Sequence, residues 1–170
     1  LHLLSRRQRQ TCIRDRLTFV AQLSGELAGT EWENKTVSVK EITIQNAQVP
    51  ASLAFNTGTV NWKDAASLMV AGCNTALSTT ACAPSVPVMV KPATDILVNI
   101  DLSVEGAIQS YTNLKIKKED GSNLATLEGY SHQVTFNITP PKTAQGAVGI
   151  EASAKIEAWK PGDAGKVDIQ

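Results

Sequence analysis

The chain has 170 residues, with sixteen basic and sixteen acidic side chains, so its formal net charge is zero. This length suits a single domain that can bury a core without metal ions or many disulfides. No apolar run is long enough to span a membrane, and no basic stripe marks a surface for nucleic acid. The sequence therefore argues against a membrane-spanning helix and against nucleic acid as a partner.

Positive charge is concentrated at the start of the chain. All five arginines lie in residues 1–16, where Asp15 is the only acidic residue, so this segment carries +4. Residues 17–170 hold eleven lysines against fifteen carboxylates, a net of −4.

Residues 9–15 resemble the translated end of a transposase tag used to prepare sequencing libraries. We expect residues 1–16 to be a non-native, unstructured artefact that precedes a truncated gene. The alternatives are a basic tail and the remnant of a secretory signal.

Residues 17–170 are dominated by alternation of apolar and polar side chains, which predicts short β-strands. The first strand is expected at Leu17, Phe19, Ala21 and Leu23. Residues 37–44 also alternate, but the phase slips by one residue around positions 40 and 41. A slip of this kind predicts either a β-bulge or two short strands.

Later segments repeat the same pattern with turn residues between them. The cleanest strand is expected over residues 96–104, and others over 114–118, 134–138 and 148–158. Gly121 marks a hairpin turn because glycine accepts a positive φ. Three prolines predict an edge strand or an extended connection, namely Pro84, Pro87 and Pro92. Residues 26–32 and 64–70 are the only helix-like windows, and both are short. These features predict an all-β protein, an antiparallel β-sandwich of about seven to nine short strands.

Residues that could carry catalysis are scarce. His132 is the only histidine in residues 17–170, and we expect it to be an exposed surface residue. No nucleophile elbow, phosphate-binding loop or zinc-protease motif occurs. Asp163 and Asp168 lack the dense spacing of oxygen ligands in a calcium loop. We therefore expect no enzymatic activity, no cofactor and no metal site.

The sequence also offers one candidate disulfide. Cys73 and Cys82 have eight residues between them, and a pair this close can close a small loop in an exported protein. The spacing lacks the paired clusters of a zinc site. The alternative is two unrelated buried thiols, and Cys12 lies in the segment expected to be an artefact.

Several stretches, taken in their order along the chain, resemble the fimbrillin family of pilus subunits and surface lipoproteins from Bacteroidota. They are residues 40–47 with 55–62, residues 96–104, residues 127–139 with their Gly-Tyr pair before a strand, and residues 156–165 with Trp159 and a glycine-rich end. The resemblance implies transthyretin-like β-sandwich domains behind a lipoprotein signal. Residues 17–170 would then be the C-terminal sandwich domain, with leftover strands of a truncated preceding domain.

The same resemblance implies a structural subunit of a cell-surface fimbria, anchored at the outer membrane and facing the outside. In pilus-forming members an arginine-specific protease removes the first strand, and a neighbouring subunit donates a strand to the vacated groove, which is β-augmentation. The candidate donor is residues 166–170, where Val167 and Ile169 lie on one face. An ordinary last strand or a frayed tail are the alternatives for that segment.

Partners implied by the resemblance are other pilus subunits and surface ligands of host or bacterium. The alternative function is a non-polymerising adhesin or glycan-binding domain of a surface lipoprotein. Exposed aromatic side chains would favour that alternative. The chain holds only eight aromatic residues, and its three tryptophans are more simply explained as packing in the core or at an edge.

Overall fold

The computed structural model describes residues 16–54, 56–118, 120–127 and 130–158, and it confirms the predicted all-β class for them. These residues form eleven strands. The strands are β1 (Arg16–Leu23), β2 (Val37–Ala47), β3 (Pro50–Ala54), β4 (Thr59–Trp62), β5 (Ala66–Met69), β6 (Thr75–Ala76), β7 (Leu97–Val104), β8 (Ala107–Lys115), β9 (Lys117–Lys118), β10 (Tyr130–Thr139) and β11 (Gly149–Ala158). The count exceeds seven to nine because β6 and β9 have two residues each, too few to show alternation.

Neither helix-like window forms a helix. Residues 64–70 contain β5, and residues 26–32 form turns and bends. In the described part of the chain, no helix is long and apolar enough to cross a membrane.

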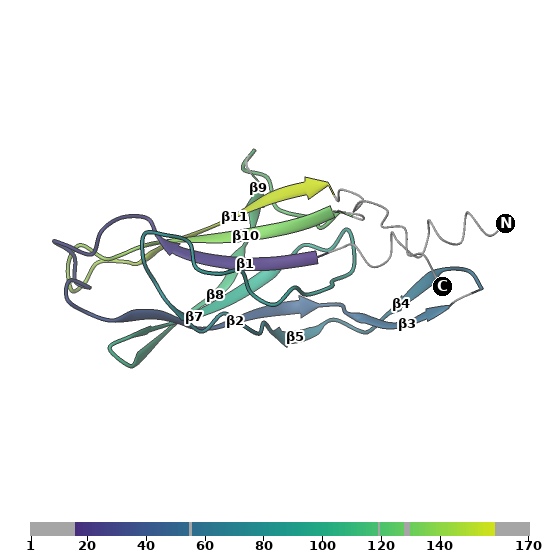
Figure 1. The fold of residues 1–170 in the computed structure, drawn as a ribbon, viewed down its shortest axis with the longest axis horizontal. Helices are drawn as coiled ribbons and strands as arrows, with labels where there is room; N and C mark the ends of the chain where they lie inside the picture. The colour runs from purple at the N-terminus through teal and green to yellow at the C-terminus, as the bar shows by residue number, and fades with distance from the viewer. Residues whose placement is uncertain (1–15, 55, 119, 128–129, 159–170) are drawn as a thin grey trace, which may run out of the picture.

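The strands build two main sheets and one separate hairpin (Figure 1). Sheet A has the strand order β1-β10-β11-β9. Sheet B has the order β5-β2-β7-β8, and β6 also pairs with β2. The hairpin of β3 and β4 extends from one end of the molecule (Figure 1).

Both main sheets contribute to one hydrophobic core. Alternate residues of the central strands β7 and β10 are completely buried, namely Val98, Ile100, Leu102, Val134, Phe136 and Ile138. Burying a side chain of this size contributes roughly 1.5–3 kcal/mol. Phe19 of β1 stacks on Phe136 of β10, with ring centroids 6.0 Å apart and an interplanar angle of 12°. The first strand is therefore part of the core rather than an appendage.

The phase slip in the second strand is a β-bulge. The register of β2 against β7 shifts between Val39 and Glu41. The extra residue, Lys40, lets Val39 and Ile42 both point inward, each with 1% of its surface exposed. The bulge prediction is confirmed, and β2 is one strand of eleven residues.

Two strand pairs are parallel, which corrects the expectation of a fully antiparallel sandwich. β1 runs parallel to β10, from Arg16 opposite Ser131 to Leu23 opposite Ile138. β11 runs parallel to the short β9. Alternation in a sequence shows which side chains of a strand share a face, but it does not give the direction of the neighbouring strand.

Of the segment predicted to be an artefact, residues 1–16, only the last residue belongs to the described part of the chain. Arg16 is the first residue of β1, so the strand starts one residue before the expected limit. Residues 1–15 lie outside the described residues.

Candidate functional site: the edges of the first strand

The outer edge of β1 is covered by an irregular extended segment, residues 78–88, which we call the covering segment. It runs antiparallel to β1, and its bonds begin with the Leu23 amide donating to the carbonyl of Ser78 at 2.8 Å. They end with a reciprocal pair between Leu17 and Val88, at 2.8 and 2.9 Å. The prolines of this region had predicted an edge strand or an extended connection, and the structure contains the extended connection.

Two side chains of the covering segment accept hydrogen bonds that a regular strand would accept with backbone carbonyls. The amide of Phe19 donates to Ser85 Oγ at 3.0 Å, and the amide of Ala21 donates to Cys82 Sγ at 3.2 Å. In return, the amides of Ser85 and Cys82 donate to the carbonyls of Phe19 and Ala21 at 2.9 and 3.1 Å. Pro84 has no amide hydrogen, so a regular ladder could not continue through it. The side chains of Ser85 and Cys82 therefore accept the hydrogen bonds of two β1 amides at places where the backbone of the covering segment provides no acceptor.

The inner edge of β1 is joined to β10 by polar side chains as well as by the parallel ladder. Gln22 Nε2 donates to Asn137 Oδ1 at 2.7 Å. The hydroxyls of Ser24 and Thr139 share a hydrogen bond of 2.8 Å just beyond the end of β1. These contacts fix the register of the parallel pair, which is slightly less stable per residue than an antiparallel pair.

His132 is buried, with 1% of its surface exposed, which corrects the expectation of a surface residue. Its Nε2 accepts a hydrogen bond from the amide of Leu127 at 3.1 Å. Its ring also hydrogen-bonds with the backbone of Arg16. An accepting Nε2 carries no proton, so Nδ1 is the protonated nitrogen that donates to the Arg16 carbonyl. Burial lowers the pKa of His132, and the bond to Arg16 offsets part of that shift. The imidazole therefore ties the start of β1 to residue 127.

The two candidate disulfide residues are free thiols in the structure. Cys73 is buried and Cys82 is half-buried. Burial is the main cause that raises the pKa of Cys73 to about 11, the charge of Cys82 raises it further, and a hydrogen bond with Ser85 lowers it. The two sulfur atoms therefore interact electrostatically beside the covering segment, although no bond joins them.

Among the described residues, β9 is the strand that pairs with the second edge of β11. β9 pairs with Ser153 and Ala154, two of the ten residues of β11. A shallow hollow of about 500 Å³ lies beside this junction. Its lining is mostly charged and comes from Lys118, Asp120, Ala154, Lys155 and Ile156.

The remaining candidates fall in different places. Val167, Ile169, Asp163, Asp168 and Trp159 lie outside the described residues. No group of three or more His, Cys, Asp or Glu side chains within the described ranges could hold a metal ion.

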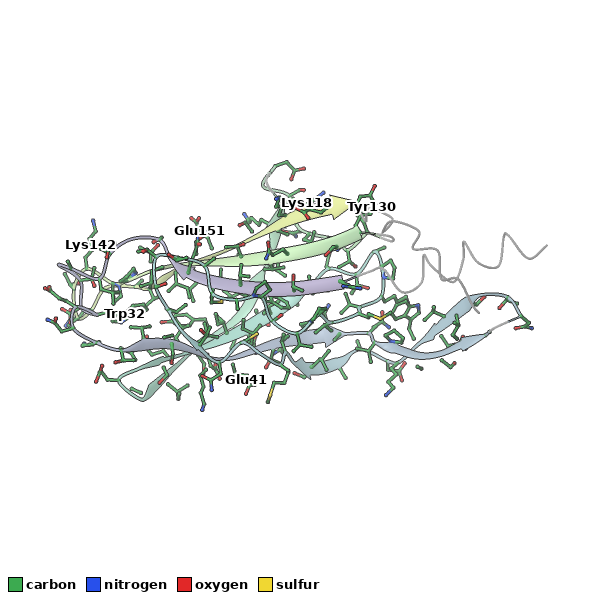
Figure 2. All side chains as sticks on the ribbon, viewed as in Figure 1. Trp32, Glu41, Lys118, Tyr130, Lys142 and Glu151 are labelled. Carbon is green, nitrogen blue, oxygen red and sulfur yellow. The ribbon has the colours of Figure 1, made fainter. Side chains whose placement is uncertain are left out.

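The aromatic side chains divide between core and surface. Trp32 is buried with 2% exposure, and Trp62 on the hairpin is half-buried. Tyr130 is exposed to 37% and lies far from Trp32, at the start of β10 (Figure 2).

Comparison with known proteins gives one distant structural similarity. No protein-family model matches the chain, and no curated protein matches it significantly. A crystal structure of a candidate cell adhesion protein from Bacteroides uniformis aligns with 86% of this chain at 15% sequence identity and a TM-score of 0.36. The chain spans about half of that protein, 51% of its length.

Proposed function

We propose that this chain is a structural subunit of a cell-surface fimbria or pilus, which assembles when one subunit donates a β-strand to the next. The observation that carries the proposal is the environment of β1, which fills a slot between β10 and the covering segment. A slot with backbone partners on both sides accepts an extended segment by β-augmentation.

The slot selects for alternating apolar side chains. In this subunit it is filled by Leu17, Phe19, Ala21 and Leu23, whose exposures are 0, 1, 1 and 5%. A donated strand would have to present apolar side chains at every second position to replace them. Residues 166–170 have this pattern, with Val167 and Ile169 separated by one polar residue.

Three further properties belong to the same proposal. The fold is a transthyretin-like sandwich, the protein is held at the outer membrane and faces the outside, and it has no catalytic activity. The last point is supported by His132, because both of its ring nitrogens hold backbone groups. Its partners are other pilus subunits.

Deleting residues 166–170 tests strand donation. The full chain should form ladders of oligomers that resist detergent without boiling, and the deletion should abolish the ladders and leave a folded monomer. A matched pair of double variants sharpens the test. Val167→Asp with Ile169→Asp should also abolish ladders, whereas Lys166→Ser with Asp168→Ser, on the opposite face, should leave them. Ladders that persist after the deletion would refute donation by this segment.

The second candidate function is a non-polymerising adhesin or glycan-binding domain. The hairpin of β3 and β4 supports it, because this hairpin extends from one end of the molecule and carries the half-buried Trp62 (Figure 1). An indole has an apolar face and a polar edge, which suits it to binding surfaces. Signal on a glycan array that is lost with Trp62→Ala, in a protein that forms no ladders, would favour this function.

A further inference from the structure

Ser85 and Cys82 are neighbours along the outer edge of β1. Ser85 Oγ accepts from the amide of Phe19 and Cys82 Sγ accepts from the amide of Ala21. These two amides belong to one strand and are two residues apart, so they are about 7 Å from each other and point to the same side. The hydroxyl and the sulfur bound to them therefore occupy adjacent positions on this edge.

Cys73 reaches the same position from another loop. Its Sγ donates a long hydrogen bond to the carbonyl of Ala71 at 4.0 Å, and its pKa is raised by the charge of Cys82 and lowered by Ser85. The loop of residues 70–73 is held against the covering segment by the Val86 amide, which donates to the carbonyl of Ala71 at 2.9 Å. Gly72 permits this approach. Its φ is +81°, and a Cβ there would lie 3.2 Å from the amide nitrogen of Val86.

We propose that Cys73 and Cys82 form a redox-controlled latch, which cross-links residues 70–73 to the covering segment and so controls access to the outer edge of β1. The structure contains the reduced form, in which the covering segment lies on β1 and no disulfide joins the two thiols. Closure stabilises the covering segment over β1 whether or not subunits polymerise, so the latch does not depend on the proposed function.

Closure is a two-step exchange with an oxidant that is itself a disulfide, such as oxidised glutathione. The thiolate of Cys82 attacks one sulfur of the oxidant and expels one thiolate, which leaves a mixed disulfide. The thiolate of Cys73 then attacks the Cys82 sulfur and expels the second thiolate. Two protein thiols lose two electrons and two protons, and the oxidant is reduced to two thiols. Cys82 reacts first because it is half-buried, whereas Cys73 is buried.

The buried thiol sets the speed of the second step. Burial is the main cause that raises the pKa of Cys73, and it persists in the mixed disulfide, where Cys82 no longer carries a charge, so few molecules carry the Cys73 thiolate at neutral pH. The closing step should therefore accelerate about tenfold for each pH unit above neutral pH until the thiolate predominates.

The bonding pattern of β1 provides an internal control. The amides of Leu17, Phe19, Ala21 and Leu23 donate to the covering segment. Because successive amides of a strand point to opposite edges, the amides of Thr18, Val20 and Gln22 face β10 instead. A latch on the covering segment should slow hydrogen exchange at the first set more than at the second.

The test uses the full chain with Cys12→Ser, so that only the two latch thiols remain. After treatment with oxidised glutathione and denaturing alkylation, intact mass should show the loss of two hydrogens and no alkylated cysteine. The oxidised protein should unfold about 5–10 °C above the reduced protein, as expected for a small closed loop. Hydrogen exchange should slow at Phe19 and Ala21 and change less at Val20.

Two variants serve as matched controls. Cys73→Ser should stop at a glutathione adduct on Cys82, and Cys82→Ser should react little. Any of three outcomes would overturn the latch. These are two alkylatable thiols after prolonged oxidation, a lasting glutathione adduct in the two-thiol protein, and disulfide-linked dimers. If a variant fails to fold, the comparison of the two-thiol protein before and after reductant decides the question by the same mass and exchange readouts.

Discussion

Two buried polar side chains hold β1, one at its start and one near its middle. His132 joins the backbone of Arg16, at the start of the strand, to the amide of Leu127. Ser85 accepts from the amide of Phe19 in the middle of the strand and donates to the carbonyl of Val86 at 3.1 Å. Buried polar groups cost free energy when a partner is lost, so both residues make β1 sensitive to single substitutions.

His132 should make the stability of the fold depend on pH. Its pKa in the folded state lies below the ordinary value of 6.5, so below about pH 6.5 the unfolded state binds a proton that the folded state does not. Above that pH, the titration of His132 should not change the free energy of unfolding. It should fall as pH drops below 6.5, by at most about 1.4 kcal/mol per unit, until the folded pKa is reached.

Urea unfolding between pH 7.5 and 5.5 measures this effect. His132→Gln should remove most of the pH dependence in this window, whereas His2→Gln should leave it unchanged. Equal slopes for the original chain and for His132→Gln would contradict the assignment.

Ser85→Ala should lower the free energy of unfolding by about 1–3 kcal/mol, because it leaves the buried amide of Phe19 without an acceptor. Ser110→Ala, at an exposed position of β8, should change it by no more than about 0.5 kcal/mol. Chemical denaturation of both variants checks the difference, and equal losses would show that the Ser85 hydroxyl has no special role.

The burial of His132 could have been predicted from the sequence. It has the same parity as Val134, Phe136 and Ile138, which all point into the core, so alternation alone assigns it to the inward face. The role of Ser85 could not have been predicted. Nothing in the local sequence identifies a serine between Pro84 and Val86 as the acceptor for an amide 66 residues away.

Among the elements, β1 has its two edges satisfied in different ways. One edge forms a parallel ladder with β10, and the other is satisfied by a segment without regular strand structure. The apolar face of β1 nevertheless packs into the core through the stack of Phe19 on Phe136. The side chains of β1, more than its ladders, should therefore hold it in place.

Phe19→Ala should lower the free energy of unfolding by about 3–5 kcal/mol, since it removes a fully buried ring and leaves a cavity against Phe136. Ile108→Ala is the matched control, because Ile108 lies on β8 with 51% of its surface exposed. It should change stability by about 0.5 kcal/mol or less. A loss below about 1 kcal/mol for Phe19→Ala would mean that β1 contributes little to the fold.

Alternation predicted the positions and inward faces of β1, β2, β7, β10 and β11, as well as the bulge near Lys40. It could not predict that β1 runs parallel to β10, because strand direction depends on where the chain returns in space. The two-residue strands β6 and β9 are defined by the strands they pair with and leave no local pattern.

At the scale of the whole molecule, we propose that subunits join by exchanging strands. The described residues form a two-sheet core in which β1 fills a slot between β10 and the covering segment. The candidate donor, with Val167 and Ile169, lies outside the described residues. Strand exchange predicts that this segment contacts the core of another copy.

Site-specific photo-cross-linking tests whether residues 166–170 of one subunit reach the core of another. A photoreactive phenylalanine analogue replaces Ile169 in one set of chains, which are mixed with isotopically heavy chains that lack it and then irradiated. Strand donation should give light-to-heavy cross-links that map to the core-facing residues of sheet A or sheet B, and far fewer when the analogue replaces Asp168. Cross-links only within single chains, or none to heavy chains, would contradict it.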